Sequence, residues 1–267
     1  PGPARHRPGL LSAMRVLRQV RSLTAFVALV LQYVLGGLYQ RLLVWPHVLL
    51  RPRRHDEIVG GYMRGMSHVT NVIAQAGGAR LRRSGRLPTA APLLVLANHQ
   101  SLLDITNIGV LCHPYAPWFV TRSRYARFVP AVSLCLRLMR GPIIDPRDRV
   151  EAVRILKKAA REQAHGILIF PEGHRSKDGR VQEFKAAGVL TLLRENRTPV
   201  YLAVTDGMWR CRRILDFIFN MHLIDGSTDV LGPFQPPADE EALADFIQAL
   251  RQQMVDHIEA LRSARVD

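Results

Sequence analysis

The sequence has few cysteines, few aromatic residues and few acidic residues for its 267 positions. The three cysteines, Cys112, Cys135 and Cys211, are an odd number, lie far apart and form no CxxC or cysteine–histidine pattern. This argues against a disulfide framework and a cysteine-ligated metal, and we expect buried thiols in a reducing compartment. Aromatic residues are 7% of the chain, and few stand among the basic clusters. Together with the lack of a recognised binding motif, this argues against nucleic acid as a partner.

The shortage of acidic residues makes the chain strongly basic. Lysine and arginine number 37 against 22 aspartate and glutamate residues, which gives a formal net charge of +15. Such a surface attracts anions, and nucleic acid, anionic lipid headgroups and phosphorylated small molecules are the candidates. The basic residues that bracket the N-terminal apolar stretch favour a membrane among these candidates. They are Arg5, Arg7, Arg15, Arg18, Arg21, Arg51, Arg53 and Arg54.

The longest apolar stretch covers residues 23–39, interrupted only by a threonine, a glutamine and a pair of glycines. As a helix it would be about 25 Å long, against a bilayer core of about 30 Å. Apolar character resumes after Arg41, and we expect Pro46 to interrupt a continuous helix there. A single span and a two-segment anchor in one leaflet both fit, and the alternatives are a cleaved signal peptide or a buried core helix. We predict membrane-associated helices and a basic lead-in within residues 1–76.

The rest of the chain alternates between apolar runs and helical patterns. Short apolar runs bounded by turn residues predict strands at 79–85, 92–97, 117–121, 141–145, 166–170 and 199–204. Helical periodicity covers 56–76, 148–164, 186–195 and the C-terminal 237–262. This alternation predicts an α/β fold: a mixed, largely parallel sheet flanked by helices, with an N-terminal helical membrane-anchoring segment. We expect one catalytic domain at 77–267 that includes the C-terminal helix.

Polar clusters follow three of the predicted strands. They are NHQSLLD after Ala97, DPRDR after Ile144 and PEGHRS after Phe170. Because ligands bind at the carboxyl ends of parallel strands, we expect the three clusters on one rim of the sheet.

His99 and Asp104, in the first cluster, are the strongest catalytic candidates. A histidine can take the proton of an attacking hydroxyl, and a carboxylate can orient and stabilise the imidazole. Five residues of continuous helix would place the two side chains on different faces, so we expect a turn that enters a helix near Ser101. The alternative interpretation of Ser101 to Asp104 is a capping box in front of an apolar run.

The cluster after the predicted strand at 166–170, which reads FPEGHRS with Phe170 included, combines a carboxylate, a glycine and an arginine. Gly173 lets the backbone approach a ligand, and Arg175 can hold a phosphate through paired donors. Glu172 can accept a hydrogen bond from a substrate hydroxyl or simply fix the loop. Taken alone, the PEG sequence is also typical of a surface turn.

Together NHQSLLD and FPEGHRS resemble the glycerolipid acyltransferase family, which includes the 1-acyl-sn-glycerol-3-phosphate acyltransferases. Members of this family share an NHxSxxD block and an FPEGTRS block in this order. NHQSLLD agrees throughout, FPEGHRS departs at one position, and the likeness covers about residues 79–235. The resemblance implies that His99 is the general base on the acceptor hydroxyl and Asp104 its orienting partner. It further implies an acceptor-phosphate site at Glu172, Gly173 and Arg175.

The chain departs from the family pattern at several positions. Pro146 stands before the arginine of the second block, so either Arg147 or Arg149 is the candidate for a phosphate contact. After the predicted strand at 117–121, Arg122 keeps a cation that can meet the acceptor or the oxyanion, but Arg124 replaces the usual acid. His174 stands where threonine is common, and FKAAG resembles a familiar FKxGA segment.

The resemblance implies transfer of a fatty acyl chain from acyl-CoA or acyl-ACP to the sn-2 hydroxyl of lysophosphatidic acid, giving phosphatidic acid. Glycerol 3-phosphate or another lysolipid as acceptor, and a non-catalytic membrane lipid-binding protein, are the alternatives. A thioester is already activated, so we expect no cofactor and no metal. A GxSxG elbow is absent, which favours direct transfer without an acyl-enzyme. The expected partners are membrane lipids, the acceptor, the donor and acyl carrier protein, with the catalytic domain on the cytoplasmic face of the cell membrane.

Overall fold

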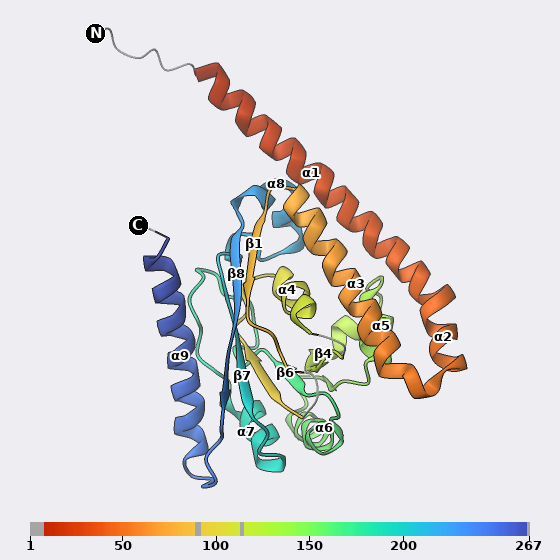
Figure 1. The fold of residues 1–267 in the computed structure, drawn as a ribbon, viewed down its shortest axis with the longest axis vertical. Helices are drawn as coiled ribbons and strands as arrows, with labels where there is room; N and C mark the ends of the chain where they lie inside the picture. The colour runs from red at the N-terminus through yellow and green to blue at the C-terminus, as the bar shows by residue number, and fades with distance from the viewer. Residues whose placement is uncertain (1–7, 89–91, 113–114, 266–267) are drawn as a thin grey trace.

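The computed structural model describes residues 8–88, 92–112 and 115–265, so residues 1–7 at the start of the predicted basic lead-in lie outside the described part. Figure 1 shows helices on both faces of a central sheet, with α1 outside one helical layer. The helices are α1 (Pro8–Tyr39), α2 (Trp45–Leu50), α3 (His55–Ala76), α4 (Leu103–Leu111), α5 (Val132–Leu138), α6 (Arg149–Glu162), α7 (Ala186–Glu195), α8 (Phe217–Asn220) and α9 (Leu243–Ser263). The strands are β1 (Arg80–Ser84), β2 (Leu94–Ala97), β3 (Trp118–Phe119), β4 (Thr121–Arg122), β5 (Ile143–Ile144), β6 (Ile167–Ile169), β7 (Val200–Asp206) and β8 (Asp225–Phe234).

The main sheet has six strands in the order β1-β8-β7-β2-β6-β3. The β7–β8 pair is antiparallel and the other pairs of this sheet are parallel, which confirms the predicted α/β class. Alternate side chains of β2 enter different cores: Leu94 and Leu96 pack with α6, α7 and α9, whereas Val95 packs with α3, α4 and α5. A strand buried on both faces needs apolar residues at every position, and this explains its continuous LVLA run.

The predicted single rim was wrong for the DPRDR cluster. β5, which precedes that cluster, pairs with β4 in a separate two-stranded sheet. The change of partner occurs at one step of the chain: the Val120 N–H donates to Leu168 O of β6 at 2.8 Å, and the next N–H, of Thr121, donates to Pro142 O at 2.9 Å. The clusters after β2 and β6 share the rim of the main sheet, because these two strands pair in parallel.

The prediction that Pro46 interrupts the N-terminal helix was also wrong. A π-helical turn, Gln40–Val44, joins α1 to α2, and the Trp45 N–H bonds to Gln40 O five residues back. Pro46 then stands in the first turn of α2, the part of a helix where proline is best tolerated.

Within the described residues, the helical segment Ala13–Leu50 is long and apolar enough to cross a membrane. One side packs against α3 and α8, where Ala25 and Leu29 are buried and the Tyr62 hydroxyl donates to Gly36 O at 3.0 Å. The other side exposes large apolar residues along its length: Leu17, Val20, Val27, Leu31, Leu35, Leu38 and Leu42. The segment therefore has one face that belongs to the protein core and one apolar face that the protein leaves uncovered.

Candidate active site

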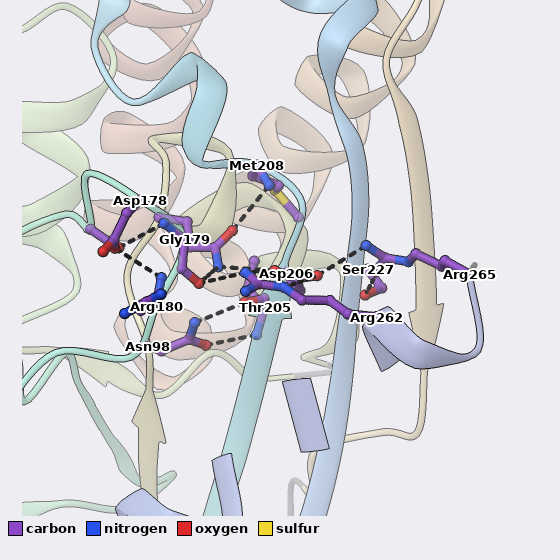
Figure 2. Close-up of polar contacts among 12 residues, drawn as sticks. Asn98, Asp178, Gly179, Arg180, Thr205, Asp206, Met208, Ser227, Arg262 and Arg265 are labelled. Atoms are coloured by element: carbon purple, nitrogen blue, oxygen red, sulfur yellow. Dashed lines mark hydrogen bonds and ion pairs between the residues drawn. The ribbon is translucent and has the colours of Figure 1, made fainter. Parts of the chain in front are cut away.

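The turn between β2 and α4 brings His99 and Asp104 together. Nδ1 of His99 lies 2.8 Å from Oδ2 of Asp104, so the two side chains expected to pair are in hydrogen-bond contact. The start of the turn is anchored by Asn98, whose amide donates to the Thr205 carbonyl and accepts from the Thr205 N–H, both at 2.7 Å (Figure 2). A turn entering a helix thus solves the geometry that a continuous helix would not allow.

The Asp104 carboxylate is fully buried and concentrates its hydrogen bonds on one oxygen. Besides His99, the backbone N–H groups of Gln100 and Ser101 donate to Oδ2 at 2.5 and 2.8 Å. The complete capping box is not formed, because α4 has Leu102 as its N-cap without a side-chain cap bond, but Asp104 still accepts from the Ser101 N–H as well as meeting the imidazole. The Ser101 hydroxyl is engaged by the Cys211 carbonyl at 2.6 Å, which does not suit it to act as a nucleophile.

The His99 ring contacts Asp104 and Phe170 and is partly exposed. Its centroid lies 4.2 Å from that of Phe170, with 26° between the planes, and its side chain is 15% exposed. Because Asp104 engages Nδ1, a substrate can meet the ring only at Nε2. This leaves one nitrogen for proton transfer and one for the orienting carboxylate.

Glu172, after β6, binds backbone groups with both carboxyl oxygens. Oε1 accepts from the His99 N–H at 2.7 Å and Oε2 from the Gln182 N–H at 3.0 Å. Burial raises the pKa of Glu172 to about 7 despite these bonds. The Ser176 N–H also donates to the His99 carbonyl at 2.7 Å, so the FPEGHRS loop binds both the N–H and the carbonyl of the His99 backbone. These contacts fit the loop-fixing alternative for Glu172 better than a direct substrate contact.

Cations gather at Gly173, whose φ of +71° favours glycine. A guanidinium N–H of Arg122 donates to the Gly173 carbonyl. The Lys185 ammonium lies on the other side, 3.1 Å from the position that a Cβ at residue 173 would take. Lys185 was not among the predicted site residues, although it lies in the FKAAG segment, whose resemblance to the FKxGA segment pointed to this region.

Among the described residues, none of the other three predicted arginines forms a hydrogen bond or ion pair with Gly173. Arg175 donates to the Arg212 carbonyl. Arg147 is exposed and forms an ion pair with Asp145 at 2.7 Å, and Arg149 is the exposed first residue of α6. In the described part of the chain, no hydrogen bond or ion pair joins Arg147 or Arg149 to the two motif loops. That part also holds no group of three or more His, Cys, Asp or Glu side chains arranged to bind a metal ion, and a metal-free reaction stays a prediction.

The fold and the site define an α/β domain with a carboxylate-held histidine at the end of a buried parallel strand. Residues 79–204 match the family model described as Acyltransferase, which confirms the resemblance drawn from the two motifs. The structure is similar to a crystal structure described as the 1-acyl-sn-glycerophosphate (LPA) acyltransferase, PlsC, from Thermotoga maritima. The TM-score is 0.68 at 21% identity, over 92% of this chain and 98% of the other.

Curated relatives carry the name 1-acyl-sn-glycerol-3-phosphate acyltransferase. The Saccharomyces cerevisiae protein is 25% identical over 176 residues, which are 64% of this chain and 56% of the relative. The Helicobacter pylori protein is 35% identical over 104 residues, which are 38% of this chain and 43% of the relative. The chloroplastic protein BAT2 of Brassica napus is 31% identical over 119 residues, which are 43% of this chain and 33% of the relative. The chain thus spans less than two thirds of the length of each of these three.

Proposed function

We propose that the chain is an O-acyltransferase that moves a fatty acyl group from acyl-CoA or acyl-ACP to the sn-2 hydroxyl of lysophosphatidic acid. The product is phosphatidic acid. The observation that carries this proposal is the 2.8 Å contact between His99 and the buried Asp104 beside a cluster of cations. The names of the relatives support the choice of acceptor.

In the proposed reaction Nε2 of His99 takes the proton of the acceptor hydroxyl while its oxygen attacks the thioester carbonyl carbon. Asp104 holds the ring through Nδ1 and stabilises the imidazolium that forms. The C–S bond then breaks, and the thiolate leaves as a thiol with the proton from the imidazolium. The proposed reaction involves neither an acyl-enzyme nor a metal.

The acceptor phosphate is assigned to the cations at Gly173. Arg122 and the exposed Lys185 flank this residue, and its φ allows a close backbone approach. We assign Glu172 to holding the His99 loop, and Arg175 to the edge of the phosphate site. Either Arg147 or Arg149 remains the candidate for a further phosphate contact. We retain residues 1–76 as the membrane-associated part and 77–267 as the catalytic domain.

The function is tested by offering the purified full chain labelled acyl-CoA or acyl-ACP with lysophosphatidic acid, glycerol 3-phosphate or a neutral lysolipid. We expect labelled product from the first acceptor only. Its phosphate, which the neutral lysolipid lacks, meets the cations, and the names of the relatives favour it over glycerol 3-phosphate. A chelator should leave the rate unchanged. Transfer to another acceptor would change the substrate assignment, whereas no transfer from either donor would favour the non-catalytic lipid-binding alternative.

We also propose that the segment Ala13–Leu50 holds the domain on the cytoplasmic face of the cell membrane. At 1.5 Å per residue its 38 residues extend about 57 Å, far more than the bilayer core of about 30 Å. Its inner face packs on α3, so a perpendicular span would draw the domain into the bilayer. An arrangement in one leaflet, with the outer apolar face in lipid, satisfies both constraints.

The membrane proposal predicts that Leu31→Gln with Leu35→Gln weakens binding to anionic phospholipid vesicles at least tenfold. Both side chains are more than half exposed, so the substitutions remove apolar surface from lipid and leave the core intact. The matched control is Val150→Gln with Val153→Gln, which changes exposed apolar residues of α6. Sedimentation with vesicles measures the binding, and equal partitioning of both double variants would contradict the assignment.

A further inference from the structure

Arg262 of α9 and Arg265, just beyond the end of this helix, both reach one buried carboxylate at the end of β7. Asp206 is 1% exposed, and its Oδ1 lies 2.7 Å from Nη2 of Arg262 while its Oδ2 lies 3.0 Å from Nη1 of Arg265 (Figure 2). Burial on its own would raise the pKa of Asp206, yet the bonds and charges of the two arginines, with a bond from Gln100, hold it below its usual value. Asp206 is therefore an ionised anchor for the end of α9.

Arg262 does more than pair with this carboxylate. Its Nη2 also donates to the Gly179 carbonyl at 2.8 Å, in the loop that continues the FPEGHRS motif. The side-chain amide of Gln100 donates to the same carbonyl at 3.0 Å and to Oδ1 of Asp206 at 3.3 Å. We call these four residues, Gln100, Gly179, Asp206 and Arg262, the Arg262 junction. It joins the ends of three neighbouring strands of the sheet to α9.

Gln100 connects the Arg262 junction to the proposed catalytic pair. It follows His99 in the chain, is fully buried, and its N–H donates to Oδ2 of Asp104 at 2.5 Å. Its side-chain oxygen accepts from the Met208 N–H at 3.0 Å, so all the polar groups of this amide are fixed. Because one peptide carries both the His99 backbone and a donor to Asp104, a shift of Gln100 changes the angle between imidazole and carboxylate.

We propose that Arg262 is a positioning residue for the His99–Asp104 pair, so that the C-terminal helix completes the active site although it contributes no group to the reaction. This inference rests on the proposed function. A guanidinium suits the role because its planar fork can reach a carboxylate and a carbonyl together. The Arg262 junction links the position of α9 to the turn after β2, through partly buried hydrogen bonds of Arg262 and fully buried ones of Gln100.

Arg265, just beyond the end of α9, offers a matched control. It shares the Asp206 carboxylate, but its other contact is the Ser227 hydroxyl at 2.8 Å. Arg262→Gln and Arg265→Gln each remove one cation from one carboxylate, so both should lower the melting temperature. Only Arg262→Gln breaks the bond to Gly179 and loosens Gln100.

The experiment compares the steady-state kinetics of the full-length variants with an acyl thioester and the acceptor that the wild-type chain uses. Arg262→Gln should lower kcat 10- to 100-fold with KM within about threefold of wild type, because the substrates still bind but the proton acceptor is misaligned. Arg265→Gln should keep kcat within twofold. Arg262→Lys retains the charge but lacks the fork, and it should stay at least fivefold below wild type.

A second measurement does not depend on turnover. The ring carbon resonance of His99 in histidine-labelled protein, assigned by its loss in His99→Gln, should move in Arg262→Gln and Arg262→Lys and stay in place in Arg265→Gln. Wild-type kcat and an unmoved resonance in folded Arg262→Gln would overturn the positioning role, and so would equal losses in both glutamine variants. A wild-type chain that transfers no acyl group would sink the proposed function, and the resonance would still decide whether Arg262 positions His99.

Discussion

His99→Ala is expected to lower kcat for acyl transfer about a thousandfold or more, since it removes the proposed general base and leaves substrate binding in place. The side chain is 15% exposed and packs on Phe170, so the folded state should tolerate the truncation. Initial rates with labelled acyl thioester and saturating acceptor measure the effect, and circular dichroism checks the fold.

The chain contains a matched control for this substitution. His257 of α9 also contacts a carboxylate, with Nε2 lying 2.8 Å from Oδ2 of Asp229, but it has no contact with either motif loop in the described structure. His257→Ala should keep activity within twofold of wild type. Equal losses in the two variants, or full activity in a folded His99→Ala protein, would contradict the assignment of His99 as the base.

Asp104→Asn is expected to lower kcat about 100- to 1,000-fold with little change in KM. The amide has nearly the same shape but no charge to stabilise the imidazolium, and its NH₂ group can hold the ring in the wrong tautomer. Because Oδ2 also receives two backbone N–H groups, the variant should lose about 1–3 kcal/mol of stability as well. Kinetics well below the variant's melting temperature measure the change in kcat, and the melting temperature itself measures the loss of stability.

The double variant His99→Ala with Asp104→Asn gives the sharper test. If the two residues act as one unit, it should be no slower than His99→Ala alone, because the carboxylate has no ring left to orient. Multiplied losses would mean that Asp104 acts independently of His99. Asp229→Asn, which alters the other histidine–carboxylate pair, should be close to wild type and serves as the control.

Local pattern was enough to predict much of the fold. The uninterrupted LVLA run predicted a strand buried on both faces, and the structure places Leu94 and Val95 in different cores. The helical periodicity at 186–195 matched α7 at both ends. The C-terminal helix, by contrast, begins at Leu243 rather than at 237, because the acidic residues before it do not enter the helix.

Errors arose where a distant segment decides the local structure. The bonds from Val120 to β6 and from Thr121 to Pro142 depend on two different chain segments, and no property of residues 117–121 reveals that switch. The position of Pro46 in the sequence likewise does not predict that a π-helical turn continues the helix there. The packing of this turn and of α2 against α3 stabilises it, and this packing involves residues distant in the sequence.

By itself, the sequence determined the α/β class, the two motif loops and the pairing of His99 with Asp104, because these follow from periodicity and from residues five positions apart. Only the tertiary structure decided which cation stands beside Gly173, that Glu172 binds the backbone N–H of His99, and that Arg262 and Gln100 both donate to Asp206 and the Gly179 carbonyl. Those contacts join residues tens to more than a hundred positions apart. Their geometry depends on how strands and helices pack, and local pattern in a single chain carries no record of that packing.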